Sequence, residues 1–211
     1  MLALAFECAG FGLSAALGRD GDVLQATRLE MDRGQPAHIV PALQALLARA
    51  EVRPTDLDRI AVTLGPGGFT GIRLGISVGL GLARSTGATF YGVNAFDVFA
   101  LSESSISNLC IAIESRRAEL FIRRYDQDGA ILGEDAVLTA EQVLDSGALH
   151  RVIGSAASKI SPKESNSEPD MTVLAAALSK IDLSGSFLAQ ARDQSTPIYL
   201  RAPEIGQKKT A

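Results

Sequence analysis

The sequence predicts an α/β protein that opens with three antiparallel strands and then alternates helices with strands. Two observations carry this prediction. An Asp-Gly turn signal at 19–22 joins two strand-like runs, where a doubly wound nucleotide-binding fold would instead place a helix. Apolar residues then recur three and four positions apart after Pro36, and a short apolar strand and a second helix follow. We therefore expect the order βββαβαβα, with crossover connections after the third strand.

The first lobe is expected to span residues 1–103. Its strands are short apolar runs bounded by turn signals. Pro36 suits the first turn of a helix, because an amide hydrogen has no intrahelical partner at that position. The expected strands cover residues 2–6, 12–18, 23–30, 59–64 and 89–93, and the expected helices cover 36–50, about 70–85 and 95–102.

The second half, residues 104–211, has weaker patterns, and we expect a smaller lobe that ends in a C-terminal tail. Residues 155–169 are rich in Ser, Lys, Glu and Pro, a composition typical of a polar connection. The expected strands cover residues 109–113, 118–125, 130–132 and 151–153, and the expected helices cover 140–146 and 171–181.

The composition excludes several classes of protein. The 211 residues are 46% hydrophobic and 21% charged, close to the globular average, which argues against disorder of the whole chain. The net charge of −4 argues against a protein whose main task is to grip nucleic acid. Two cysteines and two histidines without metal-ligand spacing exclude a zinc hydrolase. The apolar run between Arg73 and Arg84 is about half a membrane span, so we expect a cytoplasmic protein with no membrane partner.

A glycine-rich loop at residues 65–71 (GPGGFTG) joins a strand to a helix, the context in which backbone amides hold an anion. No Lys-Ser/Thr pair follows it, so it is not a Walker A motif, and its glycines are too closely spaced for a dinucleotide fingerprint. Two interpretations stay open. The loop is either a weak anion site at Gly67, Gly68 and Thr70 or a structural turn that lets the next helix pack tightly.

The helix after this loop is apolar on nearly all sides, which is typical of a helix buried on more than one side. Its small residues recur every four positions and line one ridge, where another backbone can approach closely. An intramolecular sandwich and contact with another chain would each bury it. We expect a protein–protein surface on this helix and the helix at 36–50, with the interface residues Ile39, Leu43, Leu46, Gly71, Arg73, Leu74, Gly75, Val78 and Gly79.

We expect no catalytic residue, no metal site and no cofactor on this chain alone. Residues 75–79 (GISVG) match the letters of a serine-hydrolase motif, but that motif needs a strained strand-to-helix turn and Ser77 lies inside a helix. Glu7 and Glu114 each end a strand, where a carboxylate either holds Mg²⁺ or lies in solvent. A local positive cluster is the best candidate for RNA or acidic-partner contact, although charge runs are usually solvated faces. It consists of Arg116, Arg117, Arg123 and Arg124.

Residues 65–76 (GPGGFTGIRLGI) resemble the GPGSFTGxRxG signature of the TsaB (YeaZ-like) family. Residues 114–119 (ESRRAE) are similar to its DARRGE segment, and residues 197–201 (PIYLR) match its terminal P-x-Y-L-R. The resemblance covers most of the chain. It implies an actin-like (ASKHA, ribonuclease H-like) fold of two βββαβαβα-type lobes, the second of them degenerate.

The resemblance also implies a function. TsaB proteins are non-catalytic dimerisation subunits of the bacterial tRNA threonylcarbamoyladenosine (t6A37) machinery. They pair with TsaD, which transfers a threonylcarbamoyl group to adenosine 37 of ANN-decoding tRNAs, and the ATPase TsaE joins them. ATP and metal are therefore expected in the partner subunits, and tRNA is expected to be reached through the complex. TsaB can also pair with itself when TsaD is absent.

Several positions depart from the family pattern, among them Cys8 in place of a Thr and Gln35 where His-Ser usually begins the first helix. The Asp of the first strand is Glu7 here, the Ser of the signature is Gly68, and the Asp at the later strand end is Glu114. A longer carboxylate at position 7 would disturb tuned positioning around Mg²⁺ and phosphate, which weakens any case for ATP chemistry. The alternatives are a small-molecule kinase of actin-like fold and a peptidase. The first needs a second phosphate loop and the second needs a metal cluster or a placed nucleophile, and the sequence offers none of these.

Overall fold

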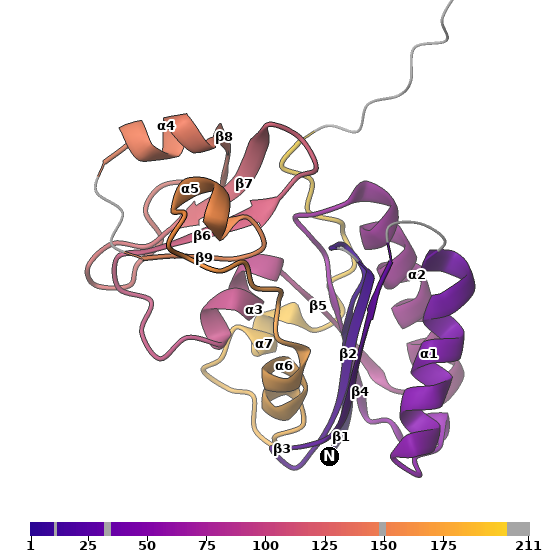
Figure 1. The fold of residues 1–211 in the computed structure, drawn as a ribbon. Coiled ribbons are helices and arrows are strands. Elements are labelled where there is room, and N and C mark those ends of the chain that lie inside the picture. Colours follow the sequence, from indigo (N-terminus) through magenta and orange to yellow (C-terminus); the bar gives the residue numbers. More distant parts are fainter. Residues whose placement is uncertain (11, 32–34, 148–150, 202–211) are drawn as a thin grey trace, which may run out of the picture.

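Two β-sheets, with helices packed on them and between them, make up the protein (Figure 1). The computed structural model describes residues 1–10, 12–31, 35–147 and 151–201, so the end of the expected C-terminal tail lies outside the described residues. Sheet A has the strand order β3-β2-β1-β4-β5, and sheet B has the order β8-β7-β6-β9. Within the described residues, none of the helices combines the length and apolar character that crossing a bilayer needs.

Sheet A has the topology of an actin-like, ribonuclease H-like lobe. β2 runs antiparallel to β1 and β3, whereas β4 and β5 run parallel to β1. A helix follows β3, another follows β4 and a third follows β5, which confirms the predicted order βββαβαβα. The strands are β1 (Leu2–Glu7), β2 (Gly12–Arg19), β3 (Asp22–Glu30), β4 (Arg59–Thr63) and β5 (Thr89–Val93).

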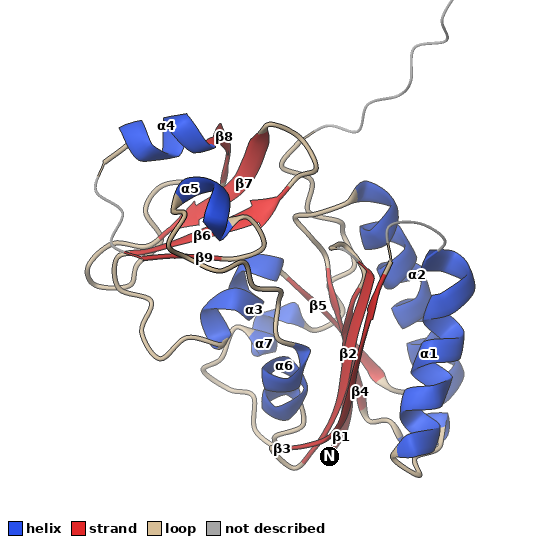
Figure 2. Ribbon diagram, in the orientation of Figure 1, coloured by secondary structure: helices blue, strands red, loops and turns tan. Residues whose placement is uncertain are grey.

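The alternation of side chains along β1 explains how sheet A is covered (Figure 2). Its large residues Leu2, Leu4 and Phe6 point to one face, where they pack with α1 (Gln35–Arg49) and α2 (Phe69–Thr86). Its alanines Ala3 and Ala5 point to the other face, where they pack with α6 (Met171–Leu178) and α7 (Leu188–Ala191). A short 3-10 helix, η1 (Pro54–Asp56), follows α1.

Sheet B repeats the first part of this plan. β7 runs antiparallel to β6 and β8, and β9 returns parallel to β6. Sheet B contains no fifth strand among the described residues, so this lobe is degenerate, as expected. Its elements are β6 (Leu109–Glu114), β7 (Glu119–Arg124), β8 (Ala136–Thr139), α4 (Ala140–Asp145), β9 (Arg151–Ile153) and α5 (Ala157–Ile160).

Two segments of the second half differ from expectation. The third strand of sheet B lies at 136–139. The segment expected there, 130–132, forms only an isolated antiparallel bridge between Ile131 and Tyr125, after a turn that the Asp126 side chain holds by accepting hydrogen bonds from two backbone amides. The segment expected as a polar connection, 155–169, contains the short helix α5, which packs on the core of sheet B.

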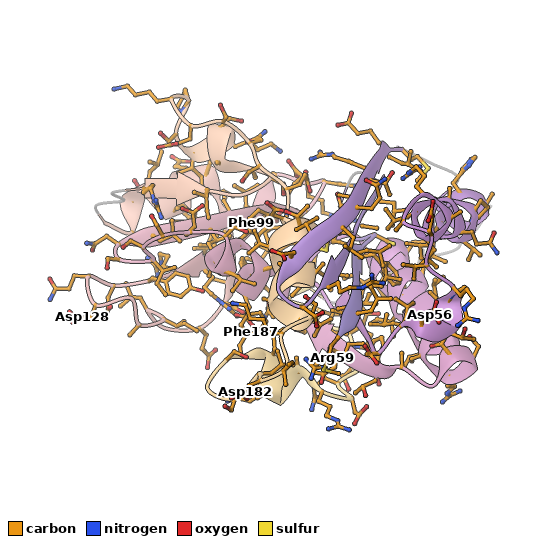
Figure 3. The ribbon with its side chains drawn as sticks, turned by 90° about the horizontal axis from the view of Figure 1, so that it is seen from below. Asp56, Arg59, Phe99, Asp128, Asp182 and Phe187 are labelled. Atoms are coloured by element: carbon orange, nitrogen blue, oxygen red, sulfur yellow. The ribbon has the colours of Figure 1, made fainter. Side chains whose placement is uncertain are left out.

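The chain then returns from sheet B to sheet A. Although the sequence division at residue 103 assigned α6 and α7 to the second lobe, both pack on sheet A. Arg59 of β4, which is labelled in Figure 3, fixes this return. It donates hydrogen bonds to the carbonyl oxygens of Leu178 and Lys180, at 2.8 and 2.6 Å. α3 (Ala95–Leu101) lies between the sheets, because Val98 packs with α6 whereas Phe96 and Phe99 pack on sheet B.

Candidate functional site

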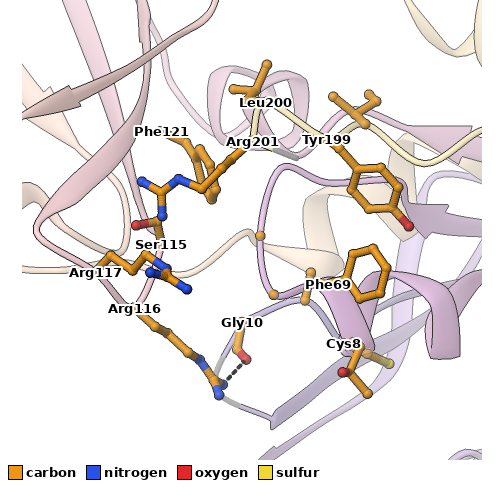
Figure 4. A pocket seen from close by; sticks show the side chains of 16 residues that line it. Cys8, Gly10, Phe69, Ser115, Arg116, Arg117, Phe121, Tyr199, Leu200 and Arg201 are labelled. Carbon is orange, nitrogen blue, oxygen red and sulfur yellow. Dashed lines mark hydrogen bonds between the residues drawn. The ribbon is translucent and has the colours of Figure 1, made fainter. Parts of the chain in front are cut away.

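A cleft of about 490 Å³ opens between the N-terminus of α2 and the turn that joins β6 to β7 (Figure 4). Four segments far apart in the sequence form its walls, with one side chain, Phe121, added from β7. The cleft therefore lies between the two lobes, and both lobes contribute to its lining. The four segments are 8–10, 67–71, 115–117 and 198–201.

The glycine-rich loop forms one wall of the cleft, and its glycines are needed for close packing. A Cβ atom at Gly71 would overlap the carbonyl oxygen of Cys8, so only glycine lets α2 begin against the end of β1. The amide of Gly68 donates a 2.8 Å hydrogen bond to the carbonyl oxygen of Ala9. Gly67, Gly68 and Thr70 all line the cleft. No side chain caps the start of α2 and its first turn holds no acidic residue, so its amide dipoles give the wall a positive character.

Three arginines make the opposite wall positive. Arg116 has φ 62° in the β6–β7 turn, and its guanidinium donates a 3.1 Å hydrogen bond across the cleft to the carbonyl oxygen of Gly10. Arg117, also exposed, follows it, and Arg201 pairs with Glu119 of β7 at 2.9 Å. Among the residues that the structure describes, no Asp or Glu lines the cleft, although the protein carries a net charge of −4. The described lining of the cleft therefore carries more positive than negative charge.

The C-terminal segment 198–201 closes one side of the cleft. The amide of Ile198 donates to the carbonyl oxygen of Leu64 at 2.7 Å. The Tyr199 ring lies 5.1 Å from the Phe69 ring, and Arg73 stacks on Phe69 at 3.9 Å while its Nε donates to the Tyr199 hydroxyl at 2.9 Å. These contacts hold the segment against the first turn of α2 and add an aromatic surface to the cleft.

Glu7 lies beneath the cleft, where it is only 5% exposed. Its Oε1 accepts a 2.6 Å hydrogen bond from the amide of Gly10. Burial, and next the nearby carboxylate of Glu168, raise the pKa of Glu7 to about 7. Glu114 pairs instead with Lys159 at 2.5 Å. No group of three or more His, Cys, Asp or Glu in the described ranges is arranged to hold a metal ion.

The structure corrects the expectation that the small-residue ridge of α2 faces a partner. The ridge lies on sheet A, where a Cβ at Gly75 would meet Val62 at 3.2 Å and one at Gly79 would meet Val62 at 2.5 Å. The apolar side chains expected on the helix at 36–50 are also in the core, at 0–2% exposure. Six expected interface residues are thus inaccessible in this fold: Ile39, Leu43, Leu46, Gly71, Gly75 and Gly79.

The other three expected interface residues lie on the outer side of α2. Arg73 is exposed, and Leu74 and Val78 are half-buried. Ser77 and Gly81, which sequence reasoning did not assign to the interface, are exposed on the same side. Ser77 and Gly81 follow Arg73 at steps of four residues, and this spacing was the signal that could have found them, because residues four apart share one face of a helix.

Arg123 was expected to contact RNA or an acidic partner. Its side chain is buried, so it is not available for that contact. Its guanidinium lies between two carboxylates, with Asp135 at 2.7 Å and Asp97 at 2.5 Å, and 4.8 Å from the centre of the Phe96 ring. Arg124, the next residue along the strand, points the other way and donates to the Ser146 hydroxyl at 2.8 Å. The alternation of faces along a strand could have separated the two arginines.

Tyr199 and Arg201 are among the cleft residues that sequence reasoning did not assign to a site. Tyr199 and Arg201 lie more than eighty residues beyond the arginine pair of the β6–β7 turn, and local patterns give no sign that the segments meet. The only signal was the match of 197–201 to the terminal motif of the family, which marks the segment without placing it.

Comparison with known proteins extends these observations. The family model described as TsaD, tRNA N6-adenosine threonylcarbamoyltransferase, matches residues 32–207. An uncharacterized protein of Mycobacterium tuberculosis is 31% identical over 206 residues, which cover 95% of this chain and 92% of that protein. The tRNA threonylcarbamoyladenosine biosynthesis protein TsaB of Escherichia coli is 32% identical over 150 residues, which cover 68% of this chain and 64% of that protein.

A solved structure agrees with the fold. An uncharacterized Pseudomonas aeruginosa protein with similarity to the peptidase YeaZ has a TM-score of 0.73 and 25% identity, over 95% of this chain and 99% of that one. The matched family model covers most of the chain, and the matched structure covers nearly all of it. The chain therefore belongs to the TsaD family, of which it is a TsaB-like member.

Proposed function

We propose that this protein is the scaffold subunit of a tRNA threonylcarbamoyladenosine machinery, without a catalytic site of its own. It pairs with TsaD, which carries out threonylcarbamoyl transfer to adenosine 37 of ANN-decoding tRNAs, and it pairs with itself when TsaD is absent. TsaE joins the assembly and supplies the ATPase, and the complex works in the cytoplasm. The proposal is supported by the likeness to TsaB of E. coli and by the outer side of α2.

The outer side of α2 is suited to close helix packing. Ser77 and Gly81 are small and exposed one turn apart, so a partner helix can approach the α2 backbone between them. Leu74 and Val78 flank them and are half-buried, which leaves apolar area for a partner to cover. We call these four residues together with Arg73 the α2 outer face. The α2 outer face is the single observation that carries the scaffold proposal.

The first test is the substitution Gly81→Arg. Apart from its chain neighbours and the nearby backbone of α2, nothing in the described part of the chain lies within 4 Å of a Cβ at Gly81, so the monomer accepts a larger side chain. Arginine is also the better helix former, and we expect the free energy of unfolding to rise by about 0.5–1 kcal/mol. At a packed interface the same side chain clashes and adds an unpaired charge. We therefore expect light scattering to show a stable monomer, and affinity for TsaD at least about tenfold weaker.

The matched control is Gly81→Ala, which adds one methyl group at the same position. It should keep self-pairing and TsaD binding close to those of the natural protein. If Gly81→Arg binds TsaD as tightly as the control does, the α2 outer face is not the interface and the scaffold proposal loses its structural support.

The functional test is reconstitution with the TsaD and TsaE of the same organism. We expect modification of an ANN-decoding tRNA to require this chain, and the isolated chain to turn over neither ATP nor peptides. The Ser77→Ala and Glu7→Ala variants serve as controls for the two candidate catalytic groups. Turnover by the isolated chain that disappears in either variant would show an enzyme instead of a scaffold.

A further inference from the structure

We propose that the α2 outer face selects a partner that presents an acidic side chain, and that Arg73 receives this carboxylate. The inference rests on the proposed function, because it names the chemistry of the partner that the same surface takes. It goes further in separating TsaD from a second copy of this chain. Three features carry it: the charge of the two outer helices, the contacts that hold Arg73, and the hydrogen-bond donors that Arg73 keeps available.

α1 and α2 form a surface without acidic residues. The two helices lie side by side on one face of sheet A (Figure 2). They carry the exposed arginines Arg49, Arg73 and Arg84, whereas all 24 acidic residues of the protein lie elsewhere in the chain. The surface is therefore positive on a protein whose net charge is −4. Such a surface attracts an acidic partner and repels a copy of itself.

Arg73 is held in place by its own helix and by the C-terminal segment. Its guanidinium carbon lies 3.9 Å from the centre of the Phe69 ring, and its Nε donates a 2.9 Å hydrogen bond to the Tyr199 hydroxyl. The Ile198 amide fixes this segment by donating to the carbonyl oxygen of Leu64. A surface arginine usually adds little to a salt bridge, because ordering its long side chain costs entropy. Arg73 is ordered before a partner arrives, so a carboxylate gains more from the contact.

Arg73 keeps donors available for such a carboxylate. In the described part of the chain its hydrogen bond is made by Nε, and neither Nη atom is used. None of the carboxylates that the structure describes pairs with it, and Asp56 of η1, which packs on α2, pairs with Arg53 at 2.7 Å. A guanidinium group binds a carboxylate through two parallel hydrogen bonds. Covering Arg73 with a partner that lacks a carboxylate leaves a charge unpaired, which is strongly unfavourable.

The same rule separates two possible partners of the α2 outer face. A second copy that docks its own α1 and α2 brings further arginines and no carboxylate from these helices. Self-pairing therefore gives Arg73 no acidic partner from the facing helices, whereas an Asp or Glu of TsaD opposite Arg73 pairs with it. Contacts that are unfavourable with the wrong partner are a general source of specificity. Arg73 thus favours TsaD over the second copy.

The test variant is Arg73→Gln, and Arg192→Gln is the matched control. Arg192 is also exposed, and it follows α7 on the opposite side of sheet A. Calorimetry measures affinity for the TsaD of the same organism, and analytical ultracentrifugation measures self-pairing. We expect Arg73→Gln to weaken TsaD binding about tenfold, as the loss of a charge-assisted hydrogen bond does, and to leave self-pairing unchanged or stronger. The control should leave both within about twofold of the natural protein.

The salt dependence of binding gives a second measurement. An attraction between Arg73 and a carboxylate is screened by salt, so TsaD binding by the natural protein should weaken as salt is raised. We expect a smaller salt dependence for Arg73→Gln. Arg73→Lys keeps the charge without the paired donors, and its affinity for TsaD should lie between those of the natural protein and Arg73→Gln.

Tyr199→Phe tests whether Tyr199 is a positioning residue for Arg73. This variant removes the hydroxyl that accepts from Arg73 and keeps the ring. We expect it to weaken TsaD binding about threefold, as the loss of a hydrogen bond that orders the arginine does. In the Arg73→Gln background the same change should have no further effect, because Tyr199 acts through Arg73.

Three outcomes overturn the proposal: unchanged TsaD binding by Arg73→Gln, equal weakening of TsaD binding and self-pairing, or a Tyr199→Phe loss that persists in the Arg73→Gln background. Thermal unfolding checks that each variant folds, and Arg73→Lys replaces Arg73→Gln if the latter does not. Failure of the proposed function gives a different result. Intact TsaD binding by Gly81→Arg removes the interface itself, whereas binding lost in Gly81→Arg and kept in Arg73→Gln refutes only the acidic contact.

Discussion

Replacing Arg123 with alanine is expected to lower the free energy of unfolding by about 3–5 kcal/mol, the cost of breaking a buried ion pair by removing one partner. Arg123 is 7% exposed and holds Asp135 of the second lobe and Asp97 of α3 at 2.7 and 2.5 Å. Without it, two carboxylates face each other in a poorly solvated site. Urea unfolding followed by circular dichroism measures the loss.

The control for this prediction is Arg124→Ala, one residue along the same strand. Arg124 donates one hydrogen bond to the Ser146 hydroxyl near the surface, so its loss should cost no more than about 0.5–1 kcal/mol. Similar losses for the two variants would mean that the Asp97–Arg123–Asp135 group does not join the lobes as the geometry indicates. A larger loss at Arg123 would show that these ion pairs stabilise the packing of α3 against sheet B.

Replacing Glu7 with glutamine is expected to stabilise the protein at alkaline pH and to change little near pH 4.5. Burial, with the nearby Glu168, raises the pKa of Glu7 from 4.5 to about 7. The folded state therefore keeps a proton that the unfolded chain loses. The stability that this proton provides is complete below pH 4.5 and is lost as the pH rises through about 7. The difference between the two pKa values corresponds to about 3 kcal/mol.

Thermal unfolding between pH 4.5 and 8.5 measures this effect. Glutamine keeps an Oε1 atom that can accept the hydrogen bond from Gly10, so the variant removes the charge with little change in shape. The control is Glu30→Gln, whose side chain is exposed on β3. Parallel pH profiles for the natural protein and Glu7→Gln would contradict a raised pKa at this position.

Local signals were sufficient to predict the first lobe. The Asp-Gly turn after residue 19, Pro36 at a helix start and the glycine loop before α2 each mark a boundary that backbone chemistry decides locally, and all appear in the structure. The return of α6 to sheet A was not predictable in this way. It depends on the fit of Gly18 against the backbone at Ala175, a contact between residues more than one hundred and fifty positions apart.

The orientation of α2 shows a different limit of the sequence. A helix that is apolar all round gives no preferred face in its periodicity, so the ridge of Gly71, Gly75 and Gly79 fitted a partner as well as the sheet. The choice is made by the surface of sheet A, where Cys8 and Val62 leave room for glycine only. The cleft was also predictable only in part, because it is formed by segments that lie far apart in the sequence. Gly67, Gly68 and Thr70 were found from the loop, whereas Arg201 was brought there by the fold.

The packing of α6 and α7 on sheet A sets an order for folding during synthesis. The strands of sheet A leave the ribosome first, and α1 and α2 soon cover the face that carries Leu4 and Phe6. The face that carries Ala3 and Ala5 lacks α6 and α7 until residues 171–191 have been made. A nascent chain therefore exposes much of this face until residues 171–191 have been translated, and it must avoid aggregation until then.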